Sequence, residues 1–499
     1  MDSLSNFLSG LSIALLPNNL FYCFIGVLAG TLVGVLPGIG PTSAVALLLP
    51  ATYHLNPISA IIMMCGIAYG AMYGGSTTSI LVNVPGEAAT VVTCLDGYQM
   101  TQKGRAGPAL GISAFGSFIA GTISVVGLMF LAPILSRAAL TFGSPEYFSL
   151  MLMSLVIVTY LVRGSMIKAL IMVGVGLLLG TVGMDVISGR ERFTYGLPVL
   201  KDGIGIIPVV IGMFGVAEVF ETLGSTIERK VFETKIKGYW PNRQDWKDSG
   251  GAIARGTILG FIMGIFPGIS PMIPSFLSYG IEKRLSKHPE RFGTGVIEGV
   301  AGPESCNNAA AVGSFVPLLS LGIPSNAFNA VLLGALMIYG LQPGPLLIKT
   351  NPNLFWGVVA SMYIGNAMLL VLNLPLIPVW VKVLRVPYKL LSILILIFCF
   401  LGSYGINNSI YDATVTFIFG IFGYLIKKRG FEPAPLILAF VLGPLIETAF
   451  RQSMIGSDGS FMVFMTRPIS AFLILVAIGI IITAFIKKRT FASSIEKEK

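Results

Sequence analysis

The sequence has 499 residues, of which 54% are hydrophobic and only 11% are charged. Soluble domains carry about 25% charged residues, so this composition excludes an ordinary water-soluble enzyme. The high apolar content also excludes a disordered chain. The fold class that it predicts is an all-α polytopic membrane protein, which lies in a lipid bilayer.

The formal net charge is +10, from 33 Lys and Arg against 23 Asp and Glu. The basic residues lie in short clusters between apolar runs, as in cytoplasmic loops that follow the positive-inside rule. We therefore expect no nucleic-acid partner. Five isolated cysteines and two distant histidines, His54 and His288, favour neither a disulfide framework nor a metal or Ser/His centre. We expect no catalytic residue, metal site or organic cofactor, so the chain is not predicted to be an enzyme.

Long apolar runs recur along the chain, and a membrane-spanning helix needs about 20 mostly apolar residues. We predict about 10–12 transmembrane helices together with two re-entrant hairpins of broken helix. The clearest spans, in chain order, are 108–134, 147–162, 167–182, 204–220, 354–374, 390–403, 413–426, 436–450 and 469–486.

Basic loops alternate with these spans, and we assign all of them to the cytoplasm. The longest polar stretch, 228–255, holds seven Lys and Arg residues and is the predicted linker between two halves. The N-terminal half comprises residues 1–227 and the C-terminal half residues 256–486. Residues 487–499 form a predicted cytoplasmic tail, whereas the side of the N-terminus is left open.

The two halves share an internal repeat, which is typical of secondary transporters. Residues 30–41 read GTLVGVLPGIGP and residues 260–271 read GFIMGIFPGISP, so six of twelve positions are identical at an offset of 230. Two weaker echoes keep the same order, with Gly74 and Pro85 against Gly313 and Pro324 (offset 239), and Gly107-Pro108 against Gly344-Pro345 (offset 237).

The loop charges predict that the two copies are inverted. Residues 256–281 contain no charged residue, lie between basic clusters and are broken at PGISP, where two prolines and a glycine interrupt a helix. This segment is therefore a predicted re-entrant hairpin that enters and leaves at the cytoplasmic side. No Lys or Arg occurs from residue 1 to residue 102, so the matching hairpin should open to the outside.

Two broken helices at matched positions indicate a transport site, because irregular backbone is tolerated in a membrane only where protein or a water-filled cavity satisfies it. A helix that restarts after such a break presents free N–H groups and a positive dipole end, which bind a carboxylate without a buried lysine. Nearby hydroxyls and amides suit the same anion or a small cation. The predicted substrate-binding residues are Pro37, Gly38, Gly40, Thr42, Ser43, Ser76, Thr77, Thr78, Ser79, Asn83, Pro267, Gly268, Ser270, Asn307, Asn308, Ser325 and Asn326.

Two plainer interpretations stand beside this one. Gly, Ser and Thr are common at helix contacts in membranes because they allow close approach, so simple packing is an alternative role for any single Ser or Thr. Each Pro-Gly break is alternatively a plain helix kink, since both residues are frequent in membrane helices. Duplication at matched spacing favours a site over a kink.

An ionisable group inside the membrane is a functional candidate by default. Glu87 and Glu304 lie near the breaks, so we predict that they couple transport to a cation, with a possible sodium site near the same breaks. The alternative is that Glu87 and two other acids cap helices near the interface. The acids in apolar surroundings are Glu87, Asp96, Glu218, Glu298, Glu304 and Glu447.

Long motifs in both halves carry a family resemblance. They are GTLVGVLPGIGPTSAVALLLP, YGAMYGGSTTSILVNVPGEAATVVTCLDGYQMTQKGRAGPALG, FPGISP and EGVAGPESCNNAAAVGSFVPLLSLGIPSNAFNAVLLGALMIYGLQPGP. With these motifs the chain resembles the large membrane subunit of the bacterial tripartite tricarboxylate transporters. The likeness covers nearly the whole chain, and the last hundred residues are less distinctive.

The resemblance implies a permease subunit in a bacterial inner membrane, which works with a small membrane subunit and a periplasmic solute-binding protein. It implies uptake of tricarboxylates such as citrate, or of related organic carboxylates, driven by an ion gradient. We favour sodium over protons as the coupling cation. The chain has no GxxxxGK[ST] phosphate loop, in agreement with transport without ATP.

Other functions stay open at this point. A stand-alone carboxylate symporter would need no binding protein, and an ion channel would use re-entrant loops as a filter. Two copies that differ in their polar residues suit one asymmetric substrate site better than a symmetric filter. An intramembrane enzyme would need a nucleophile–base pair or a metal cluster, which is disfavoured here. The sequence favours neither an elevator nor a rocking movement.

Overall fold

The computed structural model describes residues 2–36, 40–161, 165–223, 238–384 and 388–497. Within these residues, helices form almost all of the regular structure, and eight of them are long and apolar enough to cross a membrane. Six further apolar helical stretches have only 10–17 residues. The predicted all-α polytopic membrane fold is confirmed, while the larger number of crossings stays a prediction.

The chain forms two compact units, and each takes segments from both predicted halves. Unit 1 comprises Met1–Ser136 and Ile207–Leu425, and unit 2 comprises Arg137–Ile206 and Ile426–Lys499. The predicted halves therefore describe the sequence repeat rather than the compact units, and they stay a prediction.

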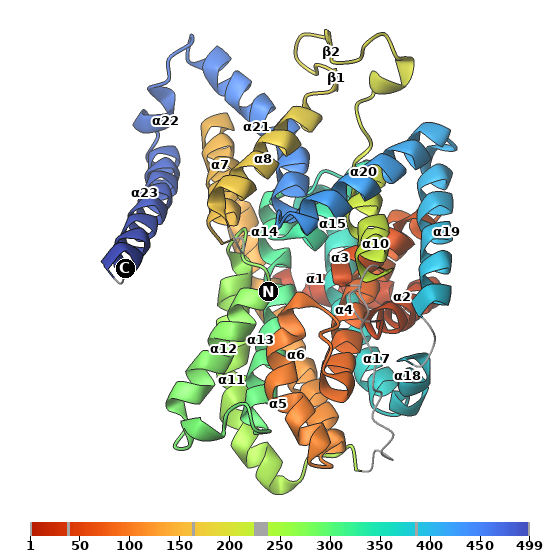
Figure 1. The fold of residues 1–499 in the computed structure, drawn as a ribbon. Helices are drawn as coiled ribbons and strands as arrows, with labels where there is room; N and C mark the ends of the chain where they lie inside the picture. The colour runs from red at the N-terminus through yellow and green to blue at the C-terminus, as the bar shows by residue number, and fades with distance from the viewer. Residues whose placement is uncertain (1, 37–39, 162–164, 224–237, 385–387, 498–499) are drawn as a thin grey trace. The chain divides into compact units, whose positions relative to one another are not determined.

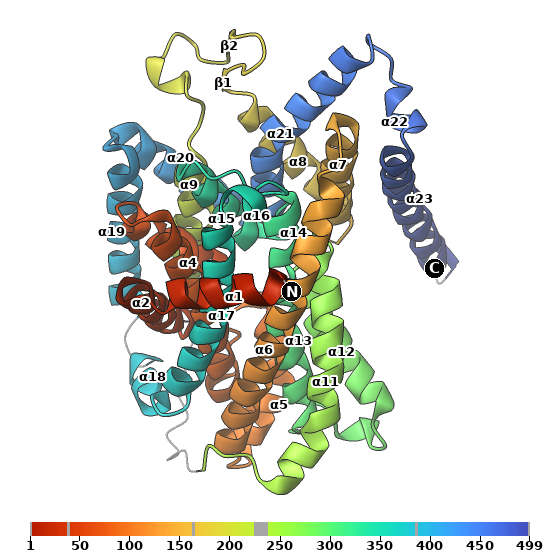
Figure 2. The same cartoon turned by 180° about the vertical axis from the view of Figure 1, so that it is seen from behind.

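Unit 1 contains both copies of the repeat (Figure 1). Figure 2 shows its N-terminal helix lying across α17. The elements that lie wholly or mostly in unit 1 are α1 (Asp2–Ala14), α2 (Pro17–Gly34), α3 (Pro41–Leu48), η1 (Leu49–Thr52), α4 (Pro57–Val82), η2 (Ala88–Thr90), α5 (Val91–Gln102), α6 (Ala106–Ala139), α9 (Ile206–Val210), η4 (Ile211–Val216), α10 (Ala217–Leu223), α11 (Arg243–Ile265), α12 (Met272–Leu285), η5 (Pro289–Arg291), α13 (Glu298–Gly313), α14 (Phe315–Leu321), α15 (Ala327–Ile338), α16 (Leu347–Thr350), α17 (Pro352–Asn373), α18 (Ile377–Leu384), α19 (Tyr388–Asn407) and α20 (Ile410–Lys428).

Unit 2 consists of helices and a short antiparallel β-hairpin. Helix α8 packs tightly on α21, since a side chain at Gly176 would overlap the Leu436 carbonyl. The elements of unit 2 are α7 (Ser144–Leu161), α8 (Met166–Gly180), β1 (Gly183–Met184), β2 (Glu191–Arg192), η3 (Pro198–Leu200), α21 (Ala434–Gly456), α22 (Val463–Thr466) and α23 (Pro468–Lys497).

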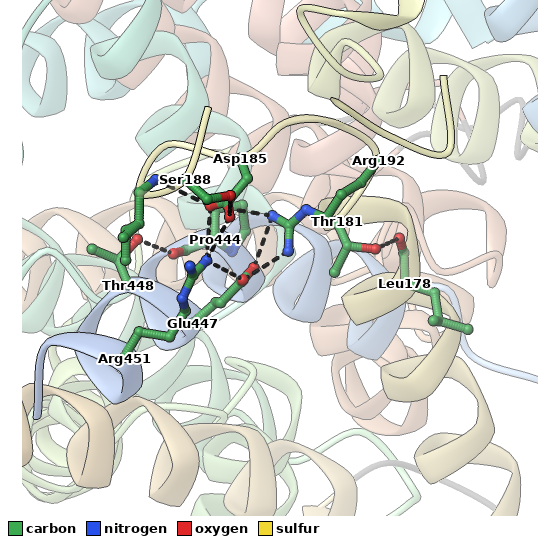
Figure 3. A network of polar contacts seen from close by, with 10 residues as sticks. Leu178, Thr181, Asp185, Ser188, Arg192, Pro444, Glu447, Thr448 and Arg451 are labelled. Carbon is green, nitrogen blue, oxygen red and sulfur yellow. Dashed lines mark hydrogen bonds and ion pairs between the residues drawn. The ribbon is translucent and has the colours of Figure 1, made fainter. Parts of the chain in front are cut away.

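An ion-pair network fixes the β-hairpin to α21, and Figure 3 shows its two carboxylates between two guanidinium groups. Arg451 lies 2.8 Å from Asp185, and Glu447 lies 2.7 Å from Arg192 and 3.1 Å from Arg451. Hydrogen bonds from Arg451 and then Ser188 hold the pKa of Asp185 well below its usual range. A carboxylate with a lowered pKa stabilises the fold above its unfolded pKa, and loses this contribution only as pH falls through the folded value. The network therefore stays ionised at neutral pH.

The nine spans that the sequence predicts all lie in helices, with shifted ends. The first is longer than predicted, because α6 runs from Ala106 to Ala139 and includes Pro133. The span predicted at 204–220 contains a π-helical segment, η4, between two short α-helices. The predicted linker falls partly outside the described residues, and its second part, from Arg243, already belongs to α11.

The sequence repeat is also a repeat of helix packing. In each copy, three glycines spaced four apart on the first hairpin helix lie against the backbone of three residues spaced four apart on the next long helix. These contacts join Gly26 to Met63, Gly30 to Ile67 and Gly34 to Ala71 in the first copy, and Gly256 to Gly302, Gly260 to Cys306 and Gly264 to Ala310 in the second. The glycines recur at the offset of 230 and their partners at the offset of 239, the two offsets found in the sequence.

The two copies run in opposite directions within unit 1. The paired helices of each copy are parallel, because their contact positions rise together along both helices. Helices α4 and α13 are antiparallel, because Ser76 contacts Glu304 while Tyr69, earlier in α4, packs on Phe315, which comes after α13. The hairpins therefore enter unit 1 from opposite ends, as an inverted repeat requires.

The second hairpin has the break that the sequence predicts. Helix α11 ends at Ile265 and α12 begins at Met272. Arg255 on α11 pairs with Glu282 on α12 at 2.5 Å, so the two arms fold back on each other. The first hairpin is formed by α2 and α3, and its tip lies outside the described residues.

We predict that residues 54 and 288 react with a thiol reagent from opposite sides of the membrane. His54 lies near Thr52, whose carbonyl accepts a hydrogen bond from Tyr339. His288 lies near the loop at 293–295, whose amides donate hydrogen bonds to Asp96. In a cysteine-free background, a membrane-impermeant maleimide should label His54→Cys in intact spheroplasts. It should label His288→Cys only after permeabilisation, because basic loops face the cytoplasm. Labelling of both positions from one side would contradict the inversion.

Candidate functional site

Two junctions, each between a hairpin and an interrupted helix, form the candidate site. Junction 1 consists of Gly40, at the start of α3, and residues 83–90. Junction 2 consists of residues 266–271 and 322–329. Both junctions lie in unit 1.

The two junctions share one backbone plan. The incoming helix ends at a left-handed residue, Asn83 (φ 57°) in one copy and Gly322 (φ 72°) in the other, 239 positions later. Glycine and asparagine adopt this conformation at low cost. The outgoing helix begins at an N-cap, which is Glu87 in junction 1 and Asn326 in junction 2, again 239 positions apart. Asn326 accepts a hydrogen bond from the amide of Asn329 at 2.9 Å, an ordinary cap.

Junction 1 is tightly packed around Glu87, which is half-buried. Gly40 lies next to Glu87, and Gly86 lies so close to α4 that any side chain there would overlap backbone. Glu87 is the N-cap residue of η2 in a capping-box arrangement with Thr90, whose hydroxyl accepts from the Glu87 amide at 3.3 Å, and the capping and coupling roles of this acid both stay predictions. Pro37 and Gly38, the predicted centre of this break, lie outside the described residues.

Junction 2 brings the second hairpin tip onto the interrupted helix. Gly268 adopts a φ of 88°, and its amide donates to the carbonyl of Ser325 at 2.8 Å. Pro267 is buried, whereas Ser270 is exposed. Ser325 is fully buried, and its hydroxyl has no hydrogen-bond partner among the described residues. A buried polar group of this kind is a candidate ligand-binding group.

Glu304 lies on α13 and is only 1% exposed. Its carboxylate accepts hydrogen bonds from Ser76 on α4 at 2.6 Å and from Ser113 on α6 at 3.2 Å, and Thr93 on α5 donates as well. None of the ion pairs found among the described residues includes Glu304. Three neutral donors therefore stabilise this buried carboxylate and join it to helices of the other copy.

Two asparagines about one turn beyond Glu304 also reach the first copy. Asn307 donates to the Glu87 carboxylate at 2.9 Å, while its own Oδ1 has no partner in the described part of the chain. Asn308 donates to the Ser117 hydroxyl at 2.7 Å. The structure thus connects three predicted site residues, Glu87, Asn307 and Glu304, through one stretch of α13.

Several predicted substrate-binding hydroxyls bond to the protein itself. Three of them donate to a carbonyl one turn earlier in α4, and these are Thr77, Thr78 and Ser79. Ser43 donates to the carbonyl of Phe214 in the π-helical segment at 3.1 Å, and Thr42 on the same helix is half-buried. Asn83 is exposed. A role of these residues in substrate binding stays a prediction.

Four polar residues of this region are not among the predicted site residues. Thr93 and Ser113 bind Glu304, and Ser117 binds Asn308. Asn329 donates to the Ser314 carbonyl at 2.9 Å beside junction 2, and its Oδ1 has no partner among the described residues. The spacing of Ser113 and Ser117, four apart on an apolar span, is a signal that could have found them, because it places both on one helix face. Nothing in the local sequence marks Thr93.

The chemistry available at the junctions is that of a binding site. Within the described residues, no group of three or more His, Cys, Asp or Glu side chains could hold a metal ion. Glu87 and Glu304 bring negative charge, and the other groups are hydroxyls, amides and helix N–H groups. Such groups bind carboxylates or small hard cations.

A family model and one known protein match the chain over most of its length, and two further proteins match less than half of it. A model described as the tripartite tricarboxylate transporter TctA family matches residues 20–438. An uncharacterized 52.8 kDa protein in the TAR-I ttuC' 3' region of Agrobacterium vitis is 51% identical over 486 residues, which is 97% of each chain. A second protein of that organism, in the TAR-II ttuC' 3' region, is 50% identical over 227 residues, 46% of this chain and 94% of its own. The uncharacterized protein MJ1079 of Methanocaldococcus jannaschii is 25% identical over 195 residues, 39% of this chain and 48% of its own. No solved structure matches the chain.

Proposed function

The chain belongs to the tripartite tricarboxylate transporter TctA family, and we propose that it is the permease subunit that carries an organic carboxylate across a bacterial inner membrane. Membership makes it a multi-pass membrane component of a transporter, and the family works with other subunits in tripartite transporters. The proposed partners are a small membrane subunit and a periplasmic solute-binding protein. The proposed substrates are tricarboxylates such as citrate, or related carboxylates.

One observation carries this proposal: two hairpins enter unit 1 from opposite ends, and the described part of each lies against an interrupted helix. Inverted repeats with interrupted helices are the architecture in which transporters form a site open alternately to either side. A carboxylate needs donors, and the start of an interrupted helix supplies N–H groups and a positive dipole end.

The proposed energy source is a cation gradient, with sodium favoured over protons. Glu87 in junction 1 and Glu304 on α13 each accept hydrogen bonds from neutral side chains. A carboxylate without a cationic side chain beside it can attract a coupling ion. The basic loop at 103–105 lies beside the basic start of α11, since Arg105 pairs with Asp245, which supports a cytoplasmic assignment of that end.

Uptake by proteoliposomes tests the proposal. Vesicles that hold the chain and its small membrane subunit should accumulate labelled citrate or another carboxylate when solute-binding protein is present outside and sodium is higher outside than inside. The control vesicles contain the same proteins without a sodium gradient.

Each alternative has its own result in this assay. Accumulation without the binding protein would favour a stand-alone symporter, and single-channel current steps would favour an ion channel. Uptake that ignores both sodium and proton gradients would contradict cation coupling.

A further inference from the structure

The two junctions have equivalent backbones but different charges. Each N-cap lies 239 positions from its counterpart, yet the cap is Glu87 in junction 1 and Asn326 in junction 2. The segment NVPGEAAT around Glu87 carries one acid, whereas FPGISP and IPSNAFNA in junction 2 contain no charged residue. The two junctions therefore differ by one full charge at their matched N-caps. A difference of this size means that they would not attract the same ligand.

Junction 1 has the groups of a cation site. The Glu87 carboxylate supplies negative charge, and Asn307, whose amide nitrogen donates to it at 2.9 Å, has a side-chain oxygen without a partner among the described residues. Asn307 is 1% exposed, so this oxygen is shielded from bulk solvent. Carboxylate and amide oxygens are ligands of hard cations. The same carboxylate already occupies the start of η2, where it would repel a substrate carboxylate.

Junction 2 has the groups of an anion site. Helix α15 has 12 residues, and its positive end is capped by the neutral Asn326. The residue before the cap, Ser325, is fully buried and has a hydroxyl with no partner in the described part of the chain. This hydroxyl can donate to a carboxylate. Asn329 adds an amide oxygen that has no partner within the described ranges, but no net charge.

We propose that the two junctions bind different ligands. Junction 1 binds the coupling cation, sodium, through Glu87 and Asn307. Junction 2 binds a carboxylate of the substrate beside Ser325 and Asn326. This inference rests on the proposed function as a cation-coupled carboxylate transporter. It turns a symmetric fold into two unlike sites through the identity of one N-cap residue.

Sodium-dependent thermal unfolding of the purified full-length chain tests junction 1 without any transport. The unfolding temperature of the wild type should rise with sodium chloride, with choline chloride keeping ionic strength constant. Glu87→Asn, which copies the cap of junction 2, should raise the half-saturating sodium concentration by about tenfold or more. Asn307→Leu, similar in size but without the amide oxygen, should act in the same direction. The control Glu290→Asn makes the same change at an exposed acid in η5 and should behave as the wild type.

Three results would overturn the sodium assignment. One is a wild-type unfolding temperature that ignores sodium, and a second is one that follows pH instead, which would identify a proton. The third is a normal half-saturating sodium concentration in both Glu87→Asn and Asn307→Leu.

The KM for the carboxylate in the proteoliposome assay tests junction 2. Asn326→Asp keeps a good N-cap but adds a negative charge, so it should raise KM by about tenfold or more while the half-saturating sodium concentration stays near that of the wild type. An unchanged KM would overturn the carboxylate assignment. Absence of uptake by the wild type would refute the proposed function and this carboxylate assignment together, whereas the sodium titration would still decide junction 1.

Discussion

Gly260→Leu should prevent the chain from accumulating as a folded membrane protein. Gly260 on α11 faces the backbone of Cys306 on α13, and even a Cβ atom there would overlap the Cys306 carbonyl. Overpacking a core usually costs about 1–3 kcal/mol. The cost here should be at the upper end or beyond, because the obstacle is backbone and cannot change rotamer. Gly260→Ala should give an intermediate loss.

The same helix supplies a matched control for this prediction. Gly250 is exposed on α11 and has nothing within reach of an added side chain, so Gly250→Leu should fold normally. Fluorescence-detected size-exclusion chromatography of detergent extracts measures the folded fraction of each variant. A monodisperse peak of normal height for Gly260→Leu would show that α11 and α13 can separate, and would contradict backbone-to-backbone packing as the basis of the repeat.

The helices and the second break could be predicted because each leaves a local signal. An apolar run of about 20 residues defines a span, and a Pro-Gly pair without a charged neighbour defines an interruption. The repeat offsets of 230 and 239 also carry structural information, since the glycine contacts of α2 and α11 follow them. Local signals of this kind can be recognised in the sequence without knowing which helices pack together.

The partners of the polar residues could not be predicted, because they depend on packing between segments far apart in the chain. Glu304 was predicted from its burial in apolar sequence, but its three hydroxyl donors come from α4, α5 and α6. The sequence places Glu447 in apolar surroundings, yet this acid belongs to the network of Arg192 and Arg451 at the β-hairpin. A single sequence shows that an acid lies in an unusually apolar segment. It does not show whether a hydroxyl or a guanidinium group will hydrogen-bond to that acid.

Glu304 offers the sharpest separation between a structural and an electrostatic role. Glu304→Leu should strongly destabilise the chain, at about 1–3 kcal/mol for each buried hydroxyl left without an acceptor. Ser76 can turn back to the carbonyl of Met72, which lies 3.2 Å away, so Thr93 and Ser113 should account for most of this loss. Glu304→Gln keeps one carbonyl acceptor and a similar volume, so it should fold.

The Glu304→Gln variant therefore tests the role of the negative charge separately from the role of Glu304 in folding. Because Glu304 lies about one turn from Asn307, which contacts Glu87, removal of its negative charge should weaken cation binding in this region. Sodium-driven uptake should fall by about tenfold, as expected for a loss of roughly 1.4 kcal/mol of cation binding. Uptake measured against sodium concentration, with unfolding temperature measured in parallel, checks both parts. If Glu304→Gln keeps normal uptake and normal sodium dependence while Glu304→Leu unfolds, then Glu304 only joins helices of the two copies, and coupling depends on Glu87 without it.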